Sequence, residues 1–333
     1  MGVTCTDCRK VDGGVFMTTA NSVFKKGFSG SAVGIIVAFL FISPAGAFFQ
    51  PDYQNRCTTN FMDALVPPGF IVQNFFYYYK STDLRVRSHE TDGDFRLSVN
   101  VNLTQFVYIS EKKWGWAHPG FEVIVPVISG HLTDAGGNRS HESGLGDIFA
   151  AFMWQSDPCP VTLGRREMSF SWRFIAGAFV PVGEYDHEDA FNPGCNYTTY
   201  HLYWSTTWLL QPRWTISARF MYNIHTKNSR YGPNRDSLRV GQLFNVHVAT
   251  AYECSPGVRF GLMGHYWRQT TDDKLNGRSL RGRELLFSWG PGLFLNAPVN
   301  RVNLFMEAHA LFDTVVRNRP RGTTFQIRAG IMF

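Results

Sequence analysis

The chain has 333 residues, of which 44% are hydrophobic and only 17% are charged, and its formal net charge is +6 at pH 7. This composition excludes intrinsic disorder, which requires low hydrophobicity and high charge. The positive excess is small and scattered along the chain, so it does not indicate a nucleic-acid partner. Aromatic residues make up 15% of the chain and there are 31 glycines, which favours an aromatic-rich β protein.

Only one apolar run, at residues 33–49, approaches the length of about 20 residues that a membrane-spanning helix needs. Two lysines precede the run, and it ends in small residues at Ala47. This order predicts a cleaved signal peptide at residues 1–47, with an uncleaved membrane anchor as the alternative. Met17 would begin a leader of more ordinary length and is an alternative start. The sequence does not determine the pairing of the four later cysteines, Cys57, Cys159, Cys195 and Cys254.

From residue 69 onward, apolar and polar residues alternate in segments that turn residues separate. A period of two places successive side chains on opposite faces of a strand. The segment at 69–80 is aromatic on both faces, so its phase stays unassigned, and the alternation after Leu103 drifts out of phase. In chain order, the clearest segments are 95–103, 170–180, 200–210, 214–224, 302–312 and 325–333, and weaker ones begin near residues 120, 144, 240, 258 and 284.

We count about 12 such strands, most of them about 11–15 residues long. Strands of soluble proteins usually have about 5–6 residues, whereas a strand needs about 9–11 to cross a membrane. Short connections alternate with longer ones, as in bacterial outer-membrane barrels. Two connections depart from this alternation, because 156–168 is long for a turn and 317–321 is short for a loop.

The predicted fold class is therefore all-β. It is a transmembrane antiparallel up-and-down β-barrel of about 12 strands at residues 69–333, after a cleaved signal peptide. The predicted location is the outer membrane of a Gram-negative bacterium. A secreted all-β domain with a lectin-like or sandwich fold is the alternative. Residues 48–68 are predicted to be a periplasmic N-terminal segment or a plug, since a barrel of this width is not filled by its own side chains.

Four short motifs and the last residue carry a resemblance to known proteins. The motifs are LVPPGF at 65–70, SGLGD at 143–147, VPVGEY at 180–185 and NPG at 192–194. In this order, they resemble the outer-membrane family called meta-pathway phenol-degradation or SphA-like proteins. The resemblance implies a single barrel for uptake of hydrophobic or aromatic compounds. The terminal Phe333 matches the insertion signature of outer-membrane barrels, which implies the barrel-assembly machinery as a partner.

If the apolar faces meet lipid, the polar residues that alternate with them line the lumen. Both charge signs occur among them, so they either border a channel or brace the wall through ion pairs. Five are histidines, but strand phase does not show the convergence that a metal site needs. We therefore predict no metal and no cofactor. The predicted lumen residues are Arg96, Asn100, Glu122, Asp147, Arg173, His201, Tyr203, Arg219, His225, His247, Arg259, His265, Glu307, His309, Asp313 and Arg328.

The longer connections carry arginines, which bind phosphate groups through two parallel hydrogen bonds. We expect outer-membrane lipid and lipopolysaccharide as partners of these arginines, and a merely solvated rim is the alternative. The predicted lipopolysaccharide contacts are Arg230, Arg235, Arg278, Arg281, Arg319 and Arg321.

The predicted function is an outer-membrane channel or transporter for small hydrophobic or aromatic ligands. One alternative is an outer-membrane lipid hydrolase, which needs a serine beside a histidine base where the barrel meets lipid. The histidines of the strands are predicted to face inward and no G-x-S-x-G motif occurs, so we do not expect an enzyme. The other alternative is a structural barrel that transports nothing.

Overall fold

The computed structural model describes residues 59–333 apart from residues 88, 91, 92, 135, 165 and 212. The predicted signal peptide at 1–47 and the first part of the predicted segment at 48–68 lie outside the described residues. Within the described residues, no helix is both long enough and apolar enough to cross a membrane.

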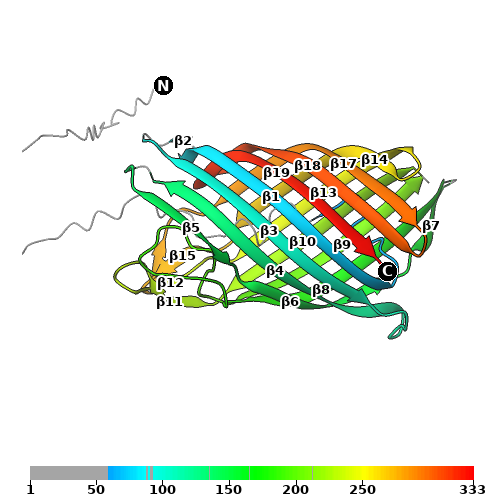
Figure 1. Ribbon diagram of the computed structural model, residues 1–333, viewed down its shortest axis with the longest axis horizontal. Helices are drawn as coiled ribbons and strands as arrows, with labels where there is room; N and C mark the ends of the chain where they lie inside the picture. Colours follow the sequence, from blue (N-terminus) through cyan, green and yellow to red (C-terminus); the bar gives the residue numbers. More distant parts are fainter. Residues whose placement is uncertain (1–58, 88, 91–92, 135, 165, 212) are drawn as a thin grey trace, which may run out of the picture. The chain divides into compact units, whose positions relative to one another are not determined.

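In the described part of the chain, twelve long strands form one antiparallel sheet that closes into a barrel (Figure 1). The last strand pairs with the first from Ile71–Met332 to Arg85–Arg319, which closes the sheet. The predicted fold and the predicted strand number are confirmed. The strands are β1 (Gly69–Val86), β3 (Arg96–Ile109), β4 (Ala117–Thr133), β6 (Ile148–Ser156), β8 (Arg166–Val180), β9 (Thr199–Gln211), β10 (Trp214–His225), β13 (Leu243–Ser255), β14 (Val258–Gln269), β17 (Leu285–Val299), β18 (Val302–Arg317) and β19 (Arg319–Met332).

Short strands explain the two connections that depart from the alternation. β7 (Cys159–Leu163) pairs with the start of β8, so the long connection at 156–168 is an extension of a hairpin. The short connection predicted at 317–321, between β18 and β19, is a turn at Asn318, which has a φ of 54°. Two other short strands, β2 (His89–Glu90) and β5 (Arg139–Leu145), pair with strands of the barrel. The remaining four form a separate four-stranded sheet: β11 (Lys227–Tyr231), β12 (Asp236–Arg239), β15 (Asp273–Leu275) and β16 (Arg278–Leu280).

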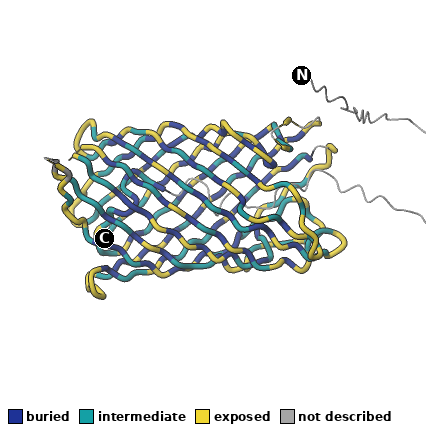
Figure 2. Tube along the Cα trace, turned by 180° about the vertical axis from the view of Figure 1, so that it is seen from behind, coloured by how far each residue is buried: buried dark blue, intermediate teal, exposed yellow. Residues whose placement is uncertain are grey.

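Each long strand buries one face and exposes the other, as the alternating colours along the trace show (Figure 2). So much exposed apolar surface is not found on soluble monomers, whereas a spanning barrel needs an apolar outer belt. Tyr108, Phe121, Trp214 and Tyr252 lie toward strand ends on the same end of the barrel as the C-terminal residue, where aromatic rings suit the membrane interface. Large apolar residues of the belt include Phe76, Trp204, Phe220, Leu262, Phe312 and Ile327.

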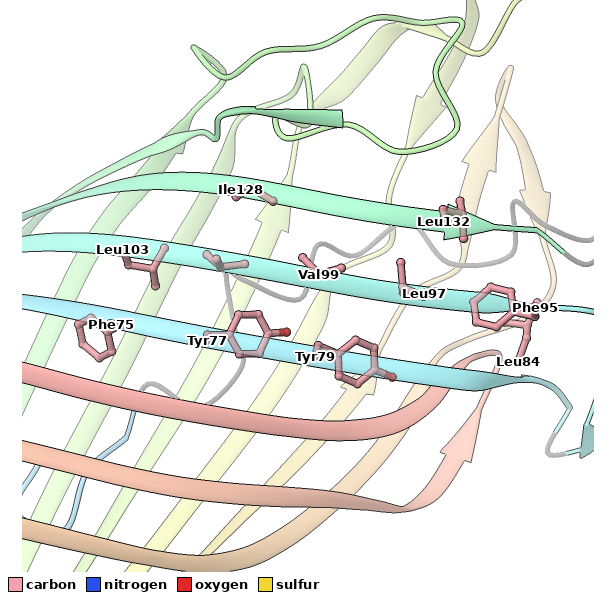
Figure 3. Close-up of a cluster of buried hydrophobic side chains, with 11 residues drawn as sticks. Phe75, Tyr77, Tyr79, Leu84, Phe95, Leu97, Val99, Leu103, Ile128 and Leu132 are labelled. Atoms are coloured by element: carbon pink, nitrogen blue, oxygen red, sulfur yellow. The ribbon is translucent and has the colours of Figure 1, made fainter. Parts of the chain in front are cut away.

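The structure corrects the predicted orientation of β3. Its apolar residues from Leu97 to Leu103 are buried on the inner face (Figure 3), and the polar residues between them face outward. Arg96 is therefore exposed over 68% of its side chain and pairs with Asp94 outside the lumen, and Asn100 also lies on the outer face. The prediction that these two residues line the lumen is wrong, because alternation defines two faces without saying which one points inward.

The outer face of β3 carries a further polar group. Asn102 and Asn74 on β1 exchange two side-chain hydrogen bonds, at 2.8 and 3.0 Å, and Asn74 also donates to Thr104 at 3.1 Å. Amides that face lipid must find partners within the protein. This mutual pairing allows a polar patch to lie on the outer wall.

Candidate functional site

One side of the lumen is an apolar surface built from three adjacent strands. The strands β1, β3 and β4 contribute to it, and it is shown in Figure 3. Phe191, from the loop after β8, packs against this surface. We call the surface the apolar inner wall; it consists of Phe75, Tyr77, Tyr79, Leu84, Phe95, Leu97, Val99, Val101, Leu103, Ile128 and Leu132.

A cavity of about 220 Å³ lies inside the barrel and shares Phe75 and Leu103 with the apolar inner wall. Further apolar side chains around it include Ile124, Phe149 and Phe179. A cavity of about 150 Å³ is large enough to bind benzene. The space therefore suits one aromatic ring with a small substituent.

Polar groups also line this cavity. Glu122 accepts a hydrogen bond from the side-chain amide of Gln105 at 2.6 Å and a longer one, at 3.4 Å, from the Tyr203 hydroxyl. The Arg219 guanidinium lies 4.4 Å from the centre of the Tyr203 ring. A ligand in the cavity thus meets both apolar surface and a few hydrogen-bonding groups, which is typical of small-molecule sites.

Residues 59–66, which we call the N-terminal segment, run inside the barrel and border the cavity. Asp63 forms two hydrogen bonds with Arg219, at 2.8 and 2.5 Å, and both side chains are almost completely buried. The backbone N–H of Ala64 donates to the Thr207 hydroxyl at 2.9 Å, and the Ser171 hydroxyl donates to the Ala64 carbonyl at 2.7 Å. Three strands of the barrel, β8, β9 and β10, therefore hold this segment in the lumen.

The other predicted lumen residues of the strands lie on the inner face, and most of them contact other polar side chains there. Glu307 accepts a hydrogen bond from Arg328 at 2.9 Å and lies 3.7 Å from His309. Arg259 pairs with Glu253 at 2.5 Å. Such pairs brace the wall, since buried charges need partners. Further contacts join His201 to Asn223 at 2.6 Å, His225 to Thr199 at 2.9 Å and Asp313 to Ser288 at 2.6 Å, and the rings of His247 and His265 lie 4.3 Å apart.

Asp147 holds a loop in place. Its carboxylate accepts backbone hydrogen bonds from Gly183 at 3.2 Å and Cys195 at 3.0 Å, which fixes the loop after β8. Cys159 and Cys254 are exposed free thiols, and Cys57 lies outside the described residues. In the part of the chain that the structure describes, no group of three or more His, Cys, Asp or Glu side chains could hold a metal ion.

The structure also corrects one of the predicted lipopolysaccharide contacts. The side chain of Arg319 is only 1% exposed; it pairs with Glu284 and lies 4.0 Å from the centre of the Trp267 ring. It is buried at the start of β19, directly after the one-residue turn, and the ion pair compensates its buried charge. The other five predicted contacts, Arg230, Arg235, Arg278, Arg281 and Arg321, are exposed.

Several residues of the site were not singled out from the sequence. Asp63 precedes the strands, so strand phase says nothing about it. Gln105 falls where the alternation of apolar and polar residues in the sequence of β3 breaks down, because the outward-facing positions after it are the aromatic residues Phe106 and Tyr108. Those two aromatic residues could have identified the outer face of β3, and so placed Gln105 in the lumen, since aromatic rings near a strand end favour the membrane interface.

Comparisons with known proteins agree with this architecture. A family model whose description names the MetA pathway of phenol degradation matches residues 82–329. The structure is similar to an outer-membrane channel from Pseudomonas putida F1, with 15% identity, a TM-score of 0.68, and coverage of 81% of this chain and 97% of that chain. No curated protein matches the chain.

Two autotransporter domains are more distant in structure. The beta domain of the Bordetella autotransporter BrkA has 11% identity and a TM-score of 0.45, and the match covers 80% of this chain and 99% of that one. The transport unit of AIDA-I from Escherichia coli has 7% identity and a TM-score of 0.49, with 87% and 94% covered. The apolar belt and the likeness to the P. putida channel identify an outer-membrane β-barrel of a Gram-negative bacterium.

Proposed function

The chain belongs to the family whose description names the MetA pathway of phenol degradation, and from this premise we propose that it is an outer-membrane channel for small aromatic and hydrophobic compounds. One observation carries the proposal: the cavity of about 220 Å³ continues the apolar inner wall through Phe75 and Leu103. The family description and the P. putida channel of the same fold support it.

The apolar inner wall supplies the path. It extends along β1, β3 and β4 from Leu84 and Phe95, near the loop end of the barrel, to the cavity. A hydrophobic molecule that follows it leaves water gradually, and each buried Å² of apolar surface contributes about 25 cal/mol. Beyond the cavity lies the N-terminal segment, so passage requires this segment to move aside.

The proposal is tested by transport through the protein purified from outer membranes. Single-channel currents are recorded in planar bilayers while phenol or toluene is titrated, and uptake is measured in a deletion strain that carries each variant. Ile124→Trp places a large ring in the cavity and should reduce uptake at least tenfold. Val125→Trp is the matched control, because the neighbouring side chain faces outward.

Compound-dependent block together with loss of uptake in Ile124→Trp would support the channel. Equal uptake in both tryptophan variants and in the deletion strain itself would refute it. Normal uptake without single-channel currents would still support transport. It would mean that the N-terminal segment keeps the lumen closed in the planar bilayer. The absence of both signals from folded protein would favour the structural barrel.

A lipid hydrolase requires separate consideration, because two histidines lie where none was expected. His131 on β4 and His141 on β5 face outward with their rings stacked 3.9 Å apart, which corrects the expectation that strand histidines face inward. Ser129 and Ser143 form the next pair on that face. Among the described residues, no hydrogen bond joins either hydroxyl to either ring, so a nucleophile–base contact is not formed.

We therefore infer that the chain is not an enzyme. The purified protein should release no fatty acid from phospholipid vesicles, with or without calcium. Fatty-acid release that Ser143→Ala abolishes would overturn this inference, and Ser140→Ala, in the same strand, is the control.

A further inference from the structure

Arg173 differs from the other arginines of the lumen. Arg219, Arg259, Arg319 and Arg328 each contact a carboxylate. Within the described residues, Arg173 has no carboxylate at ion-pair distance, although it is only 7% exposed. Its Nε and Nη2 donate to one neutral acceptor, the side-chain carbonyl of Gln155, at 2.9 and 2.5 Å.

This arrangement leaves a buried guanidinium without a carboxylate in direct contact, and the charge of Glu122 acts on it only from a longer distance. A guanidinium stays protonated in proteins, and a buried charge is costly unless a partner compensates it. Gln155 is held in turn by a hydrogen bond from its amide to the Val66 carbonyl. The guanidinium is therefore fixed in position, and its Nη1 group takes part in no hydrogen bond within the described residues.

The guanidinium borders the cavity together with aromatic side chains. Phe149 and Phe179 line the same space, and their ring centres lie 4.6 Å apart. The carboxyl of Glu122 also borders the cavity, but its hydrogen bonds run to Gln105 and Tyr203. A bound anion would therefore sit on the Arg173 side, with the two phenylalanines further along the cavity, six residues away on β6 and β8.

We infer that Arg173 forms an anion subsite and that the cavity takes small aromatic carboxylates in preference to neutral aromatics. The carboxylate accepts hydrogen bonds from the guanidinium, which matches its planar geometry, and the ring extends along the cavity toward Phe149 and Phe179. This inference rests on the proposed function and defines the substrate class of that site. A cavity of about 220 Å³ has room for a benzene ring and one carboxylate.

The test measures equilibrium binding of radiolabelled benzoate and toluene to the detergent-purified protein. Wild type should bind benzoate at least about tenfold more tightly than toluene, since a charge-assisted hydrogen bond is worth about 10- to 100-fold in affinity. Arg173→Gln should lose this preference and keep toluene binding, which also shows that the variant is folded. Arg173→Lys keeps the charge without the planar group and should retain part of the preference.

Two further variants sharpen the result. Arg259→Gln, which alters a lumen arginine that does not line the cavity, should leave benzoate binding unchanged. Glu122→Gln should strengthen benzoate binding, because it removes a negative charge from the same space. Equal benzoate affinity in wild type and Arg173→Gln would overturn the inference, and so would tighter binding of toluene by wild type. Failure of both compounds to bind or cross would instead refute the proposed function.

Discussion

The ion pair between Asp63 and Arg219 should control how firmly the N-terminal segment closes the lumen. Asp63→Asn removes the carboxylate and leaves the Arg219 guanidinium buried, with side-chain exposures of 1% and 8% in the intact pair. Removing one partner of a buried pair costs about 3–5 kcal/mol. This corresponds to a roughly 10²- to 10³-fold larger fraction of barrels in which the segment has left its site.

Hydrogen–deuterium exchange measures this fraction directly. The backbone N–H groups of Asp63 and Ala64 donate to hydroxyls of β10 and β9, so they exchange only when the segment detaches. Their exchange should accelerate about 10²- to 10³-fold in Asp63→Asn, and the open time in single-channel records should rise with it. Asp94→Asn is the control, because that carboxylate belongs to an exposed pair with Arg96 and should change little.

The double variant Asp63→Asn/Arg219→Gln separates charge from shape. It removes both buried charges, so its exchange should be slower than that of Asp63→Asn alone. Unchanged exchange in Asp63→Asn, or faster exchange in the double variant, would refute the view that the buried charge holds the segment.

Three further predictions concern the loops and the wall. Burial raises the pKa of Asp273 from 3.8 to about 6, so protonation of this carboxyl favours the folded four-stranded sheet of the loops. The resistance of that sheet to proteolysis should therefore fall as the pH rises from about 4 to about 6, and Asp273→Asn should remove this pH dependence. A bimane label at Asn102 should be quenched by brominated lipid and one at Val101 should not; the reverse would contradict the assigned orientation of β3. Arg278→Glu with Arg281→Glu should make lipopolysaccharide easier to extract with chelators, and unchanged extraction would favour a solvated rim.

The fold could be predicted because its signals are local. A strand that must cross about 30 Å of hydrocarbon is long, and it alternates wherever one face meets lipid. The segments at 214–224 and 325–333 display this pattern within their own residues, and both lie in strands of the barrel with the predicted faces outward. The membrane imposes the pattern, so no distant contact is needed to read it.

The orientation of β3 depended on tertiary structure. From residue 96 to residue 103, one face of this strand is apolar, with Leu97 and Val99, and the other is polar, with Asn100 and Asn102. The lumen decides between them, because Tyr77 and Ile128 from the neighbouring strands supply apolar partners inside the barrel. An apolar inner wall cannot be distinguished from a lipid-facing one by hydropathy, since both surfaces avoid water.

The candidate site likewise depends on contacts between distant residues. Asp63 and Arg219 are 156 positions apart, and the carboxylate of Glu122 accepts its hydrogen bonds from Gln105 and Tyr203, not from Arg173. The sequence by itself determined the strands, their number and the membrane that they cross, because alternation and strand length respond to the solvent around each residue. Which face encloses the cavity, which charges are paired and which residues close the lumen were decided only when the sheet closed and brought these side chains together.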